Sequence, residues 1–265
     1  MPRTTTMTIL AATGALMLSQ APAHAGPVQL LSQHRYVSVT GTASILDFGH
    51  GELISDTGHD AYSAAAGDFG PFDAAAIVSA FGVSGYEANA SGSGAAAQTS
   101  SLDGGAFGFT AATEMYAAGS SGVPGRGSVT ALATTGFEVG FSIAAPSRWR
   151  LEMSSAVPDS NSQFSFRLAD VAGTVIWDQT YLYDPVLGTQ YDYVTLLDLA
   201  AGEYALTAYL SSYASFDGDV AYSGQGRAGF ALAPLVELPE PHAAALLALG
   251  LAGLQRLRVA RATPA

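Results

Sequence analysis

Apolar and polar residues alternate with a period of two through much of the second half of the chain, which is the pattern of half-buried β-strands. In residues 148–154 the two faces separate cleanly, with Arg148, Arg150 and Glu152 on the polar side. Residues 136–143, 164–168 and 204–210 alternate in the same way, and 228–236 indicates a closing strand. The side chains that this pattern places in the core are Trp149, Leu151, Met153, Phe137, Val139, Phe141 and Ile143.

Two turns connect these predicted strands. The sequence Asp170-Val171-Ala172-Gly173 leads into residues 174–177 and predicts a β-hairpin. Residues 197–204 predict a strand, a tight turn with Gly202, and a second strand led by Tyr204. A tyrosine in this place caps a corner in many secreted β-sandwiches, so we expect Tyr204 to do so here.

The first half of the chain gives weaker signals. Residues 61–127 are rich in Ala, Gly and Ser, and they predict weak strands at 86–91, 95–102 and 106–116. Residues 72–81 fit either a strand or a short helix. With no fixed-period repeat, the pattern as a whole favours an all-β protein, a two-sheet β-sandwich of jelly-roll type.

Both ends of the chain carry features of sorting signals. Arg3, the apolar residues 9–18 and the sequence Ala23-His24-Ala25 indicate a signal peptide over residues 1–25. At the other end a Pro-Glu-Pro tripeptide precedes 12 uninterrupted apolar residues, 243–254, and then an Arg-rich tail. A helix of this length reaches about 18 Å, short of the roughly 30 Å of a bilayer core, and no polar stripe marks it as an ordinary amphipathic helix. The arginines are expected to stay on the cytoplasmic side.

The C-terminal arrangement resembles the PEP-CTERM sorting domain of exported Gram-negative proteins. Pro239, Glu240 and Pro241 match the signature tripeptide, and Arg256, Arg258 and Arg261 match the basic cluster. The resemblance covers about the last 25 residues, with a short apolar run and spaced arginines. It implies transient contact with the inner membrane, processing by an exosortase-type enzyme, and a final place at the cell surface or outside the cell, in bacteria that make extracellular polysaccharide. The expected organisation is therefore a signal peptide (1–25), a β-sandwich ectodomain (26–236) and a sorting signal (237–265).

Composition narrows the partners of the exported part. Up to Pro241 it contains six arginines, no lysine and 22 acidic residues, a formal charge near −16. Such a surface repels phosphate backbones, which argues against nucleic acid as a partner. The chain has no cysteine, so packing alone must hold the fold.

Two clusters of polar residues have ligand types that suit a metal ion. In residues 48–60, imidazoles and carboxylates suit zinc, but a solvated Gly-rich loop explains the segment better. Around Gly218 two carboxylates suit Ca²⁺, and an ordinary Asp-Gly turn explains them as well. We expect no cofactor unless Ca²⁺ binds there. The candidate ligands are His50, Glu52, Asp56, His59, Asp60, Asp217 and Asp219.

Four tyrosines next to aspartates form a candidate sugar-binding surface. Tyr181 and Tyr183 share one strand face, as do Tyr191 and Tyr193. A sugar ring needs an apolar face to stack on and acceptors for its hydroxyls. The alternative, which we favour, is that these rings pack the sandwich or cover its edge.

The chain carries no specific catalytic motif. Neither 82–86 nor 119–123 completes a G-x-S-x-G elbow, and the chain has no cysteine nucleophile and no phosphate-binding glycine motif. A carboxylate pair for glycoside hydrolysis could assemble from separate strands. The sequence therefore favours a non-enzymatic exported surface or matrix protein. A carbohydrate-binding module is the first alternative and a glycan-active hydrolase the second.

Overall fold

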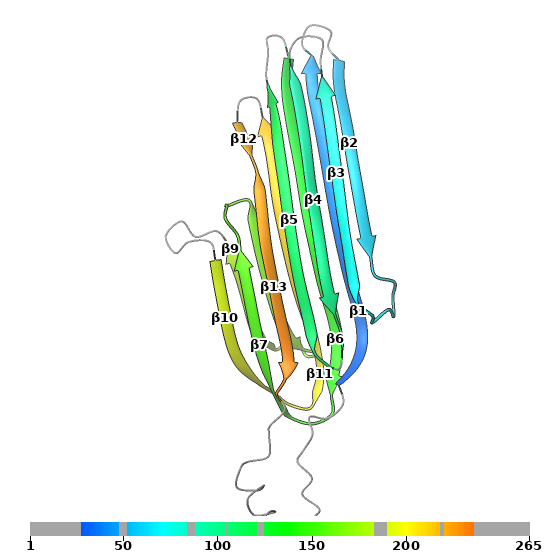
Figure 1. Cartoon of the computed structure of the whole chain (residues 1–265), viewed down its shortest axis with the longest axis vertical. Helices are drawn as coiled ribbons and strands as arrows, with labels where there is room; N and C mark the ends of the chain where they lie inside the picture. Colours follow the sequence, from blue (N-terminus) through cyan, green and yellow to red (C-terminus); the bar gives the residue numbers. More distant parts are fainter. Residues whose placement is uncertain are drawn as a thin grey trace, which may run out of the picture. The chain divides into compact units, whose positions relative to one another are not determined.

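The computed structural model describes residues 28–47, 52–83, 88–103, 105–120, 125–182, 190–217 and 220–235, which form thirteen strands in two antiparallel sheets (Figure 1). The seven-stranded sheet has the order β2 (Glu52–Ser63), β1 (Val28–Asp47), β6 (Gly125–Ile143), β11 (Gly202–Asp217), β8 (Ser162–Asp170), β9 (Val175–Leu182), with β12 (Val220–Tyr222) paired to β11. The six-stranded sheet has the order β10 (Gln190–Leu199), β7 (Ser147–Ala156), β13 (Gly224–Pro234), β5 (Phe107–Ser120), β4 (Asn89–Ser101), β3 (Phe72–Val83). The predicted all-β, two-sheet sandwich is confirmed. The expected helix over 243–254 lies outside the described residues.

The strands of the second half follow the predicted faces. On β7 the side chains of Trp149, Leu151 and Met153 are buried, whereas Arg150 and Glu152 are exposed. The predicted core residues of β6, from Phe137 to Ile143, are buried as well. Period-two alternation was a sufficient guide here because each of these strands buries one face only.

The first half departs from the prediction. Residues 52–60, expected to be a solvated loop, belong to strand β2, which pairs with β1 in unbroken register from Tyr36–Ser63 to Asp47–Glu52. Residues 89–91 and 95–101, from the two predicted strands 86–91 and 95–102, belong to one strand, β4, and the ambiguous segment 72–81 lies in strand β3. Strand β1, 20 residues long, was not predicted. Polar and small residues form these strands because their backbones complete hydrogen-bond ladders with neighbouring strands.

The core has two parts of different composition. One part is aromatic and aliphatic, and it includes Trp149, Phe141, Phe137, Phe109 and Phe230. The other contains mostly alanine and valine, from the far halves of β1, β4, β5 and β6 together with β3. The sheets are therefore packed over small side chains at one end of the strands and over rings at the other.

A buried polar layer separates the two core parts. Ser212 on β11 has its hydroxyl oxygen 2.6 Å from that of Thr113 on β5 and 2.7 Å from that of Ser162 on β8. With its side-chain amide oriented so that the nitrogen faces these acceptors, Gln98 on β4 donates to the carbonyl oxygens of Tyr36 and Gly136 at 2.8 and 3.0 Å. The Ser212–Thr113 contact and the bonds of Gln98 cross between the sheets, whereas Ser162 lies on the same sheet as Ser212. Sliding one sheet along the other would leave their polar groups unpaired and buried, so the layer fixes how the sheets align.

Arg35 forms hydrogen bonds with the segment that connects β2 to β3. In this segment the chain passes from one sheet to the other. Its side chain is fully buried, and its guanidinium donates to the carbonyl oxygens of Asp68 and Gly70 at 2.6 and 2.8 Å. The guanidinium carbon also lies 5.6 Å from the ring centre of Phe72. Burial lowers the pKa of Arg35, and the charge of Asp68 opposes that shift. No local sequence pattern indicated this role.

The two predicted turns are present. In the hairpin between β8 and β9, Gly173 has a φ of 86° and its N–H donates to the carbonyl of Asp170 at 2.9 Å. At the start of β11 the hydroxyl of Tyr204 donates to the carbonyl of Ala200 at 2.8 Å, which is the expected tyrosine corner.

Candidate functional site

The candidate tyrosines do not form an exposed row. Tyr181 on β9 is buried, and its ring centre lies 4.8 Å from that of Tyr191 on β10 and 6.1 Å from that of Phe164. Burial is the main cause of the raised pKa of Tyr181. Tyr193 is 38% exposed and packs against Trp177 at 5.1 Å between ring centres. These rings close the sandwich where β9 and β10 face each other across the two sheets, which corrects the idea of a flat acceptor face; Tyr183 lies outside the described residues.

Two acidic residues of the first candidate metal site accept hydrogen bonds from the backbone of a neighbouring strand. The N–H groups of Ile77 and Phe81, on the free edge of β3, donate to the carboxylates of Asp60 and Asp56, each at 3.0 Å. Gly58 lies between the two aspartates, where a Cβ atom would be 2.2 Å from a methyl carbon of Val78. β2 can therefore lie directly against the edge of β3, and its carboxylates satisfy backbone donors that the sheet leaves unpaired.

The other members of that candidate site are not gathered around these carboxylates. His59 is exposed and, by the alternation of the strand, points to the opposite face of β2. The side chain of Glu52 and the whole of His50 lie outside the described part of the chain. Among the described residues, no three His, Asp or Glu side chains are placed to hold a metal ion.

Asp217, from the second candidate metal site, forms an ion pair with Arg126. One of its oxygens is 2.6 Å from a terminal nitrogen of Arg126 and accepts from Nε of the same residue at 2.9 Å. Asp219 lies outside the described residues. The ion pair balances the charge of the Asp217 carboxylate, so no metal ion is needed to explain why the carboxylate lies there.

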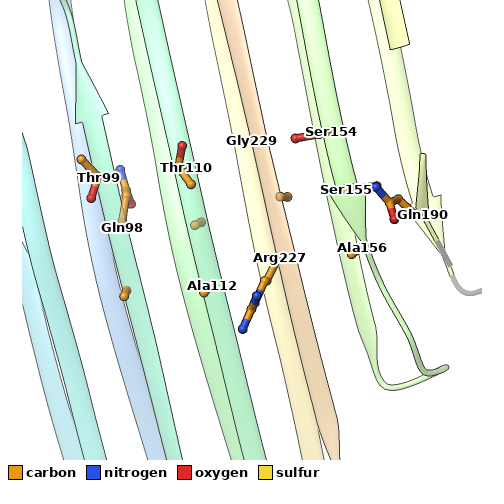
Figure 2. Close-up of a pocket in the computed structure, with 13 residues that line it drawn as sticks. Gln98, Thr99, Thr110, Ala112, Ser154, Ser155, Ala156, Gln190, Arg227 and Gly229 are labelled. Atoms are coloured by element: carbon orange, nitrogen blue, oxygen red, sulfur yellow. The ribbon is translucent and has the colours of Figure 1, made fainter. Parts of the chain in front are cut away.

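The residues that the structure describes form shallow depressions on the outer face of the six-stranded sheet. Three shallow depressions, with volumes of about 350, 350 and 330 Å³, lie over β4, β5, β13, β7 and β10. The first shares Ala97, Ala112 and Arg227 with the second, and it shares Thr110, Ser154 and Gly229 with the third. They form one continuous surface, which we call the outer trough; Figure 2 shows the residues of the first depression.

Small side chains form the floor of the outer trough because of how the strands are paired. Ala97, Ala112, Arg227 and Ala156 are neighbours across β4, β5, β13 and β7. In the adjoining row Gly229 lies between Thr110 and Ser154. A Cβ atom at Gly229 would lie 2.9 Å from the carbonyl oxygen of Phe109, so the absence of a side chain there keeps the floor open.

One row of the six-stranded sheet, which crosses the trough and continues to Asp73 on β3, has polar side chains on both sides of Gly229. Cross-strand pairing places six outward positions in this row: Asp73, Thr99, Thr110, Gly229, Ser154 and Asp192. With strands about 4.8 Å apart, the row is about 24 Å wide. It exposes three hydroxyls between two carboxylates, a set that both donates and accepts hydrogen bonds.

A partly exposed tyrosine lies at one end of the trough. At the other end Tyr193 lines the third depression, but it is paired with the buried Met153 and its ring packs on Trp177 between the sheets. Tyr116, 52% exposed, lies two residues beyond Glu114 of the second depression, and its hydroxyl donates to the Glu114 carboxylate. That hydrogen bond is the main cause of the raised pKa of Tyr116, and it draws the ring along β5 toward the trough.

The sequence contained one usable signal for the trough. Apart from Glu114 and Tyr116, the outward positions of the weak strands 95–102 and 106–116 are Ala, Thr, Ser and Gly, where a solvated sheet face usually has long polar side chains. That signal does not say which strands are neighbours, and the floor needs residues from five strands that are distant in the sequence.

Within the described residues, no helix is long and apolar enough to cross a membrane.

No protein-family model and no curated protein matches this chain. Parts of it superpose on the C-terminal CBM6 of LamC, a marine laminarinase from Zobellia galactanivorans, with 15% identity, 38% of this chain and 79% of that chain covered, and a TM-score of 0.22. For TmCBM61 in complex with β-1,4-galactotriose the values are 13% identity, 42% and 71% coverage, and a TM-score of 0.24. The superposition on the structure of infectious bursal disease virus, Gx strain, has 11% identity and a TM-score of 0.23. It covers 85% of this chain and 60% of that chain. At TM-scores this low, the likeness assigns neither a family nor an activity.

Proposed function

We propose that this protein is an exported, non-enzymatic β-sandwich that binds polysaccharide through the outer trough and acts at the cell surface or in the extracellular matrix. The observation that carries the binding proposal is the continuous trough itself, with its floor of small side chains and its polar row between Asp73 and Asp192. A shallow trough of this kind can accept an internal stretch of a polymer.

The chemistry of the trough suits sugars. Hydroxyls of Thr99, Thr110 and Ser154 can exchange hydrogen bonds with sugar hydroxyls, and the flanking carboxylates accept from them. The ring of Tyr116 offers an apolar face at one end. Each contact is weak in a solvated groove, so useful affinity requires several contacts along one chain or several protein copies on a matrix.

A bulky side chain on the trough floor should abolish polysaccharide binding. We expect Ala112→Trp to weaken binding to the producing cell's exopolysaccharide at least about tenfold, or roughly 1.4 kcal/mol, because the indole would fill the space between β4 and β13. The matched control is Ala61→Trp, the same change at an exposed position on the outer face of the seven-stranded sheet. Binding is measured by co-sedimentation with the insoluble polymer and by affinity electrophoresis with the soluble one.

The two variants separate the outcomes. Equal binding of Ala112→Trp and the wild type would move the site elsewhere, and no binding by the wild type to any polysaccharide offered would contradict the binding proposal. Release of reducing ends during the incubation would favour the glycan-active hydrolase instead.

The sorting part of the proposal rests on the terminal sequence features. We expect the mature protein to begin at Gly26 and to lose most or all of the segment after Pro241. Replacing Pro239, Glu240 and Pro241 by alanines should leave an unprocessed precursor in the membrane fraction, because the signature read by the processing enzyme is gone. A Thr263→Ala control, beyond the arginines, should be processed normally.

Mass spectrometry of the extracellular protein is the measurement. An intact C-terminal peptide in the wild-type extracellular protein would show that the sorting proposal is wrong.

A further inference from the structure

Arg227 on β13 lies at the centre of the outer trough, where the first and second depressions meet (Figure 2). Its neighbours in the register are Ala112 on β5 and Ala156 on β7. Side chains this short leave the exposed guanidinium open on both sides. Arg227 is also the one cation among the residues that line the three depressions.

The other arginines of the described residues have protein partners or face an acid. Arg126, Arg148 and Arg150 form ion pairs with Asp217, Asp198 and Glu152. Arg35 is buried against carbonyl oxygens, and Arg167 lies opposite Asp178 on the neighbouring strand. In this same part of the chain Arg227 forms no ion pair, although the protein carries a large excess of acidic residues.

The acidic residue that shares the second depression with Arg227 is engaged elsewhere. Glu114 accepts a hydrogen bond from Tyr116, which lies farther along β5 than Glu114 and away from the row of Ala112 and Arg227. The bond holds the carboxylate toward that side. The centre of the trough is therefore a free guanidinium on a floor of alanines.

A planar guanidinium binds a carboxylate through two parallel hydrogen bonds, which gives both affinity and orientation. The formal charge of the exported part, near −16, repels a densely charged polyanion. A carboxylate spaced among neutral sugars meets the arginine without bringing a second charge close to Asp192, Glu152 or Glu114. Resting on the function proposed above, we propose that Arg227 receives the carboxylate of an acidic sugar within an otherwise mostly neutral polysaccharide.

The test compares one polymer with and without its carboxylates. Gellan, in which a glucuronate recurs among neutral sugars, is used intact and after chemical reduction of its carboxyl groups to alcohols. The purified full chain is run by affinity electrophoresis in gels with each polymer, with mobilities normalised to gels without polymer. We expect the wild type to bind intact gellan about five- to tenfold more tightly than reduced gellan.

Arg227→Gln should lose this preference and bind both polymers as weakly as the wild type binds the reduced one. Arg167→Gln, which removes an exposed arginine from the other sheet, should behave as the wild type. Raising the salt to about 0.5 M should shrink the preference of the wild type, because exposed charge pairs are screened. Since Arg227 is exposed, the variant should unfold at the wild-type temperature.

Each other outcome overturns a defined part of the proposal. If wild type and Arg227→Gln bind intact and reduced gellan equally, and Ala112→Trp binds neither, the acidic-sugar inference is wrong and the trough stands as a neutral glycan site. If polygalacturonate, charged at every sugar, binds more tightly than gellan, the inference of a sparsely charged ligand is wrong. If the wild type binds none of these polymers or the native exopolysaccharide, both the inference and the binding proposal fail.

Discussion

Replacing Trp149 by alanine is expected to lower the free energy of unfolding by about 3–5 kcal/mol. The indole is fully buried in the aromatic part of the core, with ring centres 6.1 Å from Phe107 and 5.8 Å from Phe141. Its Nε1 donates to the hydroxyl of Ser147 at 2.8 Å. The substitution would therefore leave a cavity that β5 and β6, which carry these rings and are each fixed in two ladders, cannot close.

Urea denaturation followed by circular dichroism measures this change. Arg150→Ala is the matched control, because Arg150 is exposed on the same strand and its ion pair with Glu152 contributes little at the surface. We expect the control to stay within about 0.5 kcal/mol of the wild type. A loss below about 1 kcal/mol for Trp149→Ala would mean that the ring is not part of a closely packed core.

The second large effect is expected at Arg35. Arg35→Ala should destabilise the fold by about 3 kcal/mol, because it removes a fully buried side chain and leaves the carbonyls of Asp68 and Gly70 without their donors. Arg35→Met separates the two causes, since it keeps an unbranched apolar stem and removes the donors.

We expect Arg35→Met to recover only part of the loss, and Arg167→Ala, at an exposed position, to leave stability nearly unchanged. Hydrogen exchange should locate the effect in β2 and β3, which the connection held by Arg35 joins. If Arg35→Met is as stable as the wild type, the hydrogen bonds contribute nothing and packing alone explains the site.

Sequence reasoning was reliable where one strand face is strongly apolar. Trp149, Leu151 and Met153 were placed correctly because large apolar side chains alternate with charged ones, and burying the opposite face would have buried Arg148 and Arg150 without partners. The tyrosine corner at Tyr204 was predictable for a related reason, since its turn and its ring are encoded within a few residues.

The same reasoning failed for residues 52–60. Glycines, histidines and aspartates there indicate a loop, yet β1 supplies a full partner ladder and β3 supplies N–H groups for Asp56 and Asp60. These stabilising contacts come from other segments, so no property of the segment itself could reveal them. The tyrosines of β9 and β10 were open to two interpretations for the same reason: their exposure depends on how two strands from different sheets meet.

By itself, the sequence determined the all-β class, the buried faces of the second half and the excess of negative charge, because each depends on residue types and their spacing along one strand. Only the tertiary structure decided that Ala97, Ala112, Ala156, Gly229 and Arg227 share one surface. Pairing between distant strands sets that neighbourhood, and the buried polar layer around Gln98 and Ser212 holds the sheets in the alignment on which the trough depends. Such long-range pairing is a property of the whole chain, because each hydrogen-bond ladder needs a partner that local sequence does not specify.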